Sequence, residues 1–181
     1  VDPTVLPSTW WLDNNVELLT HTSATKIDRP SQQVELTNGQ SISYDLLVLA
    51  TGARARILNL PGADRARSLR TVDDSRSLAS ALSARSRLVI VGAGWIGLEV
   101  AAAARTRGVE VTVLEAAQLP LVNVLGPTLA QYLADLHQSH GVDLRCEVQV
   151  AEVLVADSLA IGVRTAEQEV HGDTVLIAAG A

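Results

Sequence analysis

The stretch GAGWIG at residues 92–97 restricts the possible folds of this chain more than any other part of its sequence. An apolar run, LVIV, precedes it at 88–91, and an alanine-rich segment that ends at Gly108 follows it. A second apolar run, VEVTVLE, then occupies 109–115. A strand, a glycine turn, a helix and a strand in this order predict two parallel neighbouring strands joined by a right-handed crossover.

The spacing of the glycines and of Glu115 predicts a dinucleotide-binding site. In the pattern G-x-G-x-x-G, Gly92 permits the tight turn, Gly94 lets the backbone approach a pyrophosphate, and Gly97 lets the helix pack on the strand. The amino end of the helix offers unpaired N–H groups to the phosphates. Glu115, eighteen residues after Gly97, is placed to accept hydrogen bonds from an adenosine ribose. Because an acid there repels a 2′-phosphate and no arginine follows in 116–124, we expect NAD(H) rather than NADP(H).

The rest of the chain predicts an α/β protein with a parallel sheet and an antiparallel appendage. Asn38-Gly39 is the strongest two-residue turn signal, and the β-rich residues around it predict a hairpin over 32–44. The continuous apolar run at 45–52 is typical of a strand buried on both faces. The other expected elements are strands at 16–20 and 23–28, helices over 71–82 and from Gly126-Pro127 to about His140, short antiparallel strands over 146–172, and a last strand at 173–181.

Composition and charge exclude several classes of function. A net charge of −6 argues against a general nucleic-acid binder, and no run of about twenty apolar residues is present to span a membrane. Cys146 is the single cysteine, which excludes an internal disulfide and fits a reducing compartment, so we expect a cytoplasmic protein. The four histidines lack metal-ligand spacing and Asp73-Asp74 is explained by helix capping, so no metal site is expected.

Longer stretches of the sequence carry a family resemblance. The segment RLVIVGAGWIGLEVAAAARTRGVEVTVLE, with YDLLVLATGARAR and LRTVDD before it and LHQSHGVDLR after it, resembles the FAD-dependent NADH:ferredoxin reductases. These flavoproteins contain two dinucleotide-binding domains. The resemblance implies a Rossmann-like, three-layer NAD domain at 59–181 and an incomplete FAD-binding domain at 1–58. It also implies that the chain is the interior of a longer protein.

The resemblance implies an enzyme that passes electrons from NADH through FAD to a [2Fe–2S] ferredoxin, which serves an oxygenase or a cytochrome P450. No side chain then needs to act as an acid or a base. Between residues 54 and 87, eight arginines stand against three aspartates, and this stretch either attracts an acidic ferredoxin or is a solvated surface. Two alternatives stay open. One is a relative of NADH oxidases and disulfide reductases with redox cysteines before Val1, and the other is an isolated NAD-binding module without redox activity.

The resemblance assigns roles to residues near the nicotinamide. Trp95 matches an aromatic residue that covers the flavin ring, although it also fits a plain packing role. Glu99 matches a carboxylate that contacts the nicotinamide carboxamide, and its alternative is an ordinary helix carboxylate. Gly180 is expected to let the backbone approach the nicotinamide, and Ile96 belongs to the turn that holds the coenzyme.

The resemblance also assigns residues to FAD. Ala50, Thr51 and Gly52 would border the flavin nucleotide, and Ala24 would offer its backbone to the adenine. Arg70 would reach FAD, unless it is a solvated arginine of a linker. FAD and NAD are therefore the expected cofactors.

Overall fold

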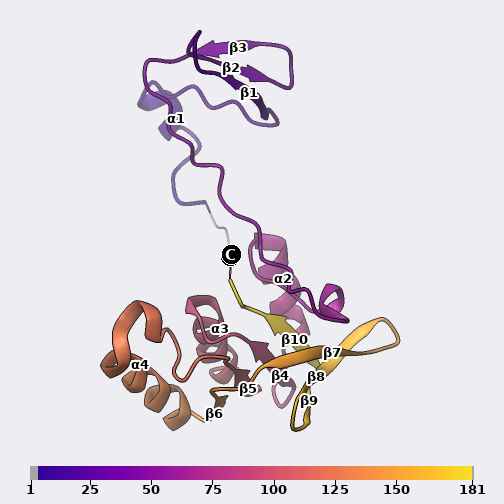
Figure 1. Ribbon diagram of the computed structural model, residues 1–181. Coiled ribbons are helices and arrows are strands. Elements are labelled where there is room, and N and C mark those ends of the chain that lie inside the picture. Colours follow the sequence, from indigo (N-terminus) through magenta and orange to yellow (C-terminus); the bar gives the residue numbers. More distant parts are fainter. Residues whose placement is uncertain (1–3, 181) are drawn as a thin grey trace. The chain divides into compact units, whose positions relative to one another are not determined.

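The computed structural model describes residues 4–180, which form two compact units, one ending at Gly52 and one starting at Ala53 (Figure 1). Each unit is described on its own. The domains predicted from the sequence are 1–58 and 59–181, of which residues 1–3 and 181 lie outside the described range. Their assignment to FAD and NAD stays a prediction.

The first unit is a small antiparallel sheet preceded by one helical turn. Its elements are α1 (Trp10–Asp13), β1 (Ala24–Asp28), β2 (Gln33–Leu36) and β3 (Ser41–Ser43), and the strands pair in the order β1-β2-β3. In the turn between β2 and β3, the side-chain oxygen of Asn38 accepts a hydrogen bond from the Gln40 amide at 3.0 Å, and Gly39 has a φ of 82°. The predicted hairpin and the predicted strand at 23–28 are confirmed.

Two predicted strands of the first unit are wrong. Residues 16–20 are irregular, because the Val16 N–H donates to the Trp11 carbonyl at 2.8 Å and so closes the turn after α1. The apolar run 45–52 forms no strand either, and its Leu46 side chain is 85% exposed. A strand needs a neighbour to pair its N–H and C=O groups, and no segment within residues 4–180 pairs with this run.

The second unit is built on a four-stranded parallel sheet with the strand order β10-β4-β5-β6. Its strands are β4 (Arg87–Val91), β5 (Glu110–Leu114), β6 (Val142–Arg145) and β10 (Thr174–Ile177). All of β10 and all of β4 after Arg87 are buried, as expected of strands covered on both faces. Since β4 pairs with both β5 and β10, the glycine turn at its carboxyl end lies between the ends of two neighbouring strands.

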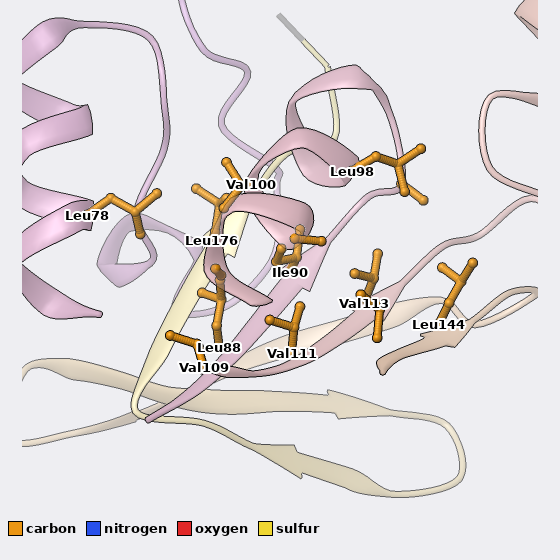
Figure 2. Close-up of a cluster of buried hydrophobic side chains, with 14 of the residues drawn as sticks. Leu78, Leu88, Ile90, Leu98, Val100, Val109, Val111, Val113, Leu144 and Leu176 are labelled. Atoms are coloured by element: carbon orange, nitrogen blue, oxygen red, sulfur yellow. The ribbon is translucent and has the colours of Figure 1, made fainter. Parts of the chain in front are cut away.

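Three helices cover one face of this sheet. They are α2 (Val72–Ala81), α3 (Trp95–Arg105) and α4 (Val122–Ser139). Figure 2 shows the apolar core on this face, in which Leu78 of α2 and Val100 of α3 share a cluster with Ile90 of β4. The long helix α4 is broken at Gly126, whose φ of 74° is not helical, so the helix predicted to open at Gly126-Pro127 is confirmed.

The predicted helix over 71–82 is also confirmed, and its start explains the acidic pair there. The Thr71 hydroxyl accepts a hydrogen bond from the Asp74 amide at 3.1 Å, and the Asp74 carboxylate accepts one from the Thr71 amide at 2.8 Å. This reciprocal arrangement is a capping box, which satisfies two backbone donors at the start of α2.

Within residues 4–180, no helix is both long enough and apolar enough to cross a membrane.

An antiparallel sheet covers the opposite face of the parallel sheet. It consists of β7 (Val150–Ala156), β8 (Leu159–Thr165) and β9 (Glu169–His171), paired in that order. A second apolar core lies between the two sheets, where Val89 and Val175 of the parallel strands share a cluster with Val153 and Val163. The unit therefore has three layers, and the predicted Rossmann-like architecture with an antiparallel appendage is confirmed.

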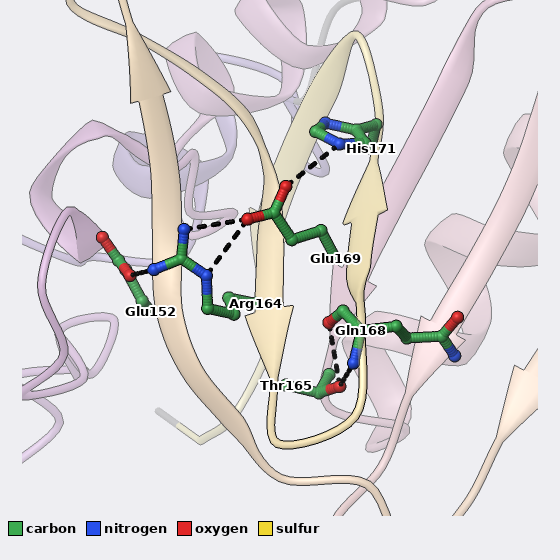
Figure 3. A network of polar contacts seen from close by, with 6 residues as sticks. All are labelled: Glu152, Arg164, Thr165, Gln168, Glu169 and His171. Carbon is green, nitrogen blue, oxygen red and sulfur yellow. Dashed lines mark hydrogen bonds and ion pairs between the residues drawn. The ribbon is translucent and has the colours of Figure 1, made fainter.

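A polar network joins the three antiparallel strands at their surface (Figure 3). Arg164 of β8 forms ion pairs with Glu152 of β7 and, at 2.8 Å, with Glu169 of β9. The His171 ring nitrogen lies 3.3 Å from the same Glu169 carboxylate. All of these side chains are partly exposed, so water screens the pairs and each adds little to the stability of the sheet.

Candidate functional site

A cavity of about 470 Å³ lies at the carboxyl ends of β4, β5 and β10. This is the edge at which open parallel sheets bind their ligands. The glycine turn and the ends of β5 and β10 form two of its walls, and segments 58–60 and 148–150 form the others. All of these segments belong to the second unit, so this unit alone builds the cavity.

Two glycines of the turn are required by close packing. A Cβ on Gly97 would lie 2.1 Å from the Gly92 carbonyl oxygen, so only glycine lets α3 approach β4 this closely. Gly92 has a φ of 104°, and a Cβ there would lie 2.9 Å from the Ala178 carbonyl. The Gly92 amide donates to the Leu114 carbonyl at 2.8 Å, which joins the turn to the end of β5. These contacts agree with the roles predicted for both residues.

Gly94 differs from the other two glycines, because a Cβ there would meet no atom closer than 3.9 Å. Its φ of −77° is open to any residue, so neither strain nor packing within the chain requires glycine at this position. The residue lines the cavity and precedes the first turn of α3, which no side chain caps. A bare backbone at the amino end of a helix is suited to the close approach of a phosphate.

Glu115 stands at the end of β5 with its half-buried carboxylate on the cavity wall. One carboxylate oxygen accepts a hydrogen bond from the Ala93 amide at 2.6 Å, and the other accepts one from the Ala117 amide at 2.9 Å. An ionised carboxylate has about four acceptor positions, so two remain for the hydroxyls of a ligand. The side chain therefore holds the glycine turn in place, a role that the spacing did not predict.

The other residues expected near the nicotinamide are only partly brought together. Gly180 lines the cavity with a φ of 105°. Trp95 and Glu99 are exposed on one side of α3, four residues apart, and neither lines the cavity. Glu99 instead lines a smaller cavity between α2 and α3, of about 280 Å³. Ile96 packs against the helix-side core, which anchors the first turn of α3.

The residues expected to contact FAD are exposed. Ala24 begins β1, and Ala50, Thr51 and Gly52 follow as irregular chain at the end of the first unit. Arg70 lies in the second unit, where its Nε donates to the Ala53 carbonyl at 2.9 Å. Arg70 thus holds the chain just after the Ala-Thr-Gly segment, a contact that sequence reasoning did not predict.

Two walls of the cavity were missed by sequence reasoning. Segments 58–60 and 148–150 show no local motif, because a distant backbone contact positions them. The Val153 amide donates to the Pro61 carbonyl at 2.9 Å, and a Cβ on Gly62 would lie 2.3 Å from the Val153 carbonyl oxygen. The Pro61-Gly62 pair was the one available signal, and it indicated a chain break rather than a docking point.

Cys146 is the single cysteine of the chain, and it packs against the helix-side core rather than lining the cavity. It is half-buried directly after β6, and burial, together with the charges of Glu115 and Glu147, raises the pKa of its thiol. The thiol therefore stays protonated at neutral pH and is a poor nucleophile. Within residues 4–180, no group of three or more histidine, cysteine or acidic side chains is arranged to hold a metal ion.

Comparisons with known proteins place this geometry in context. Residues 8–181 match the profile of the pyridine nucleotide-disulphide oxidoreductase family. Rhodocoxin reductase from Rhodococcus erythropolis is 41% identical over 177 residues, which are 96% of this chain and 42% of that protein. The ferredoxin–NAD(+) reductase subunit of the benzene 1,2-dioxygenase system from Pseudomonas putida is 38% identical over 151 residues, covering 82% of this chain and 37% of that protein.

A solved structure shows the same arrangement of elements. The ferredoxin reductase for the CYP199A2 system from Rhodopseudomonas palustris superposes with a TM-score of 0.88 at 34% sequence identity. The alignment covers 97% of this chain and 44% of that one. The chain thus spans less than half the length of these relatives.

Proposed function

The chain belongs to the pyridine nucleotide-disulphide oxidoreductase family, and from this membership we propose that it is part of an FAD-dependent reductase. The enzyme passes electrons from NADH through FAD to a [2Fe–2S] ferredoxin that serves an oxygenase or a cytochrome P450. The predicted resemblance is confirmed at the level of the family. Two relatives, named a rhodocoxin reductase and a ferredoxin–NAD(+) reductase subunit, support this choice of substrate and partner.

The cavity at the end of the parallel sheet carries the proposal, because its geometry fits NADH. The diphosphate lies over Gly94, where space is open, and receives hydrogen bonds from the first turn of α3. The hydroxyls of the adenosine ribose donate to the free positions of the Glu115 carboxylate. An added 2′-phosphate would meet this carboxylate, so the site favours NADH over NADPH.

The nicotinamide end of NADH extends toward the end of β10. Gly180 lines that part of the cavity, where its backbone approaches the nicotinamide. Trp95 and Glu99 stand on the exposed side of α3, where they are available to a flavin or a nicotinamide outside the cavity. Their role is to orient two rings, since neither side chain is needed as an acid or a base.

FAD is assigned through the family resemblance. A bound FAD would supply the chemistry that links a two-electron hydride donor to a one-electron carrier. Four exposed residues of the first unit are accessible to offer FAD backbone groups, namely Ala24, Ala50, Thr51 and Gly52. Arg70, whose Nε donates to the Ala53 carbonyl at 2.9 Å, is the residue of the second unit that would reach FAD.

We also propose that the enzyme works in the cytoplasm and binds no nucleic acid or membrane. The single cysteine and the net charge of −6 support this setting. Disulfide reduction by a cysteine pair would need cysteines outside this chain. The second alternative is an NAD-binding module without redox activity, and the following experiment distinguishes it from the reductase.

Absorption spectroscopy of the purified protein, followed by anaerobic addition of NADH and an acidic [2Fe–2S] ferredoxin, tests the proposal. We expect flavin absorbance in the visible blue region, bleaching by NADH, and reduction of the ferredoxin. Binding of NADH without flavin absorbance would indicate the binding module. Flavin that is bleached by NADH but transfers electrons only to disulfides or to oxygen would contradict the ferredoxin assignment.

A further inference from the structure

Arg56 lies at the rim of the coenzyme cavity with a free guanidinium. Its backbone N–H lies 3.5 Å from the Gly180 carbonyl oxygen, and its Cδ lies 3.6 Å from the position that a Cβ on Gly180 would occupy. Gly180 lines the cavity, and so does the segment 58–60 that follows Arg56. Within residues 4–180, the exposed side chain of Arg56 forms no hydrogen bond or ion pair.

Most other arginines of the stretch 54–87 already have partners. Arg65, Arg76 and Arg87 form ion pairs with Asp64, Asp73 and Asp173, while Arg67 bonds Ser77 and Arg70 bonds Ala53. Within residues 4–180, the side chains of Arg54 and Arg85 also form no hydrogen bond or ion pair, but Arg85 precedes the amino end of β4, where its amide donates to the Gly108 carbonyl. The length of β4, roughly 16 Å, separates it from the cavity, and this exceeds the Debye length at physiological salt.

The residues that line the cavity supply little positive charge to a bound diphosphate, and Arg56 can add to it. Among residues 4–180, Glu115 is the only charged residue that lines the cavity. The amino end of α3 supplies a partial positive charge of about one half, which leaves most of the charge of a diphosphate unopposed. A guanidinium presents paired donors that match phosphate oxygens.

The segment after β10 links the glycine turn to Gly180, over which Arg56 packs. A Cβ on Gly92 would touch the Ala178 carbonyl at 2.9 Å, so the end of β10 lies directly against the glycine turn. Arg56 packs over Gly180, two residues further along the same segment. The flexible side chain of Arg56 therefore starts from the nicotinamide end of the cavity, and it turns back toward the glycine turn to meet the diphosphate.

We propose that Arg56 folds over the cavity and pairs with the diphosphate of NADH, as a coenzyme-binding residue additional to the glycine turn and Glu115. This role rests on the proposed function, since the diphosphate belongs to the proposed coenzyme. It also gives one member of the arginine-rich stretch a task other than the attraction of a ferredoxin.

Calorimetric titration of three variants tests this role. Arg56→Gln removes the charge, Arg56→Lys keeps the charge but loses the paired donors, and Arg85→Gln removes an equal charge at the other end of β4. The ligands are NADH, ADP-ribose, which keeps the diphosphate, and adenosine, which lacks it. Circular dichroism confirms that each variant is folded, and the exposure of both arginines makes unfolding unexpected.

We expect Arg56→Gln to weaken the binding of NADH and of ADP-ribose about tenfold, and to leave adenosine unchanged. Arg56→Lys should lose part of this affinity, and Arg85→Gln should change it less than about twofold. Equal affinities of Arg56→Gln and the unaltered protein for ADP-ribose would overturn the role of Arg56 while leaving the proposed function intact. An unaltered protein that binds none of the three ligands would overturn the proposed function itself.

Discussion

Replacing Gly97 by alanine tests the packing on which the glycine turn depends. The added methyl group would lie 2.1 Å from the Gly92 carbonyl oxygen and 3.4 Å from the Ile90 side chain. An ordinary contact requires the first distance to grow by roughly 1 Å, and the obstacle is backbone that cannot rotate away. We therefore expect a loss near the upper end of the range for overpacked cores, about 3 kcal/mol of the free energy of unfolding.

The same displacement moves the first turn of α3 away from the diphosphate, so Gly97→Ala should also weaken NADH binding by more than about tenfold. Urea denaturation followed by circular dichroism measures the stability, and calorimetric titration measures the affinity. A Gly97→Ala variant as stable as the unaltered protein, with normal affinity for NADH, would refute the packing argument.

Gly94→Ala is the matched control, because its methyl group would meet nothing closer than 3.9 Å within the chain. Its backbone conformation suits alanine, so we expect a change in stability within about 1 kcal/mol. The methyl group would nevertheless occupy the space proposed for the diphosphate, and NADH binding should be lost. Retained affinity would show that the diphosphate lies elsewhere.

Further predictions concern coenzyme choice, acid stability, helix capping and the partner. Glu115→Ala should weaken NADH binding and reduce the ratio of the affinity for NADH to the affinity for NADPH. Titration with both coenzymes measures this ratio, and an unchanged ratio would contradict the role of Glu115. The pKa of Asp173 is lowered, chiefly because its carboxylate accepts a hydrogen bond from the Arg87 amide. The stability it contributes is therefore present above about pH 4 and lost as the pH falls further. Asp173→Asn should be less stable than the unaltered protein at pH 7, and this difference should narrow as the pH falls below about 4, whereas a constant difference in urea midpoints would contradict this. Thr71→Ala should cost about 1 kcal/mol in the same assay, since it removes the cap of α2, and no loss would argue against the capping box. Turnover with an acidic ferredoxin should fall as salt rises if the stretch 54–87 attracts it, and insensitivity to salt would count against that role.

The parts of the fold that sequence could predict are those specified by local chemistry. The glycine turn, the Asn38-Gly39 hairpin and the break at Gly126-Pro127 each depend on residues with restricted or unusual backbone freedom, and each appears where expected. The alternation of buried strands with an alanine-rich helix then determines the parallel core. These signals act over a few residues, so no knowledge of distant partners is needed.

The failures occur where structure depends on a distant partner. The run 45–52 has the composition of a buried strand, but it lacks a strand to pair with among residues 4–180. The cavity walls at 58–60 and 148–150 are positioned by the contact between Val153 and Pro61, which no local pattern reveals. For the candidate site, spacing located the glycines and Glu115 but not the hydrogen bond from Glu115 to the Ala93 amide, because that contact appears only after the sheet has formed.

A crystal structure of the protein with NADH would test the central claim most directly. We predict that the diphosphate lies over Gly94 at the amino end of α3, that the adenosine ribose hydroxyls bond to Glu115, and that the nicotinamide points toward Gly180. NADH bound at any other surface while the cavity between β4, β5 and β10 holds only solvent would contradict this account.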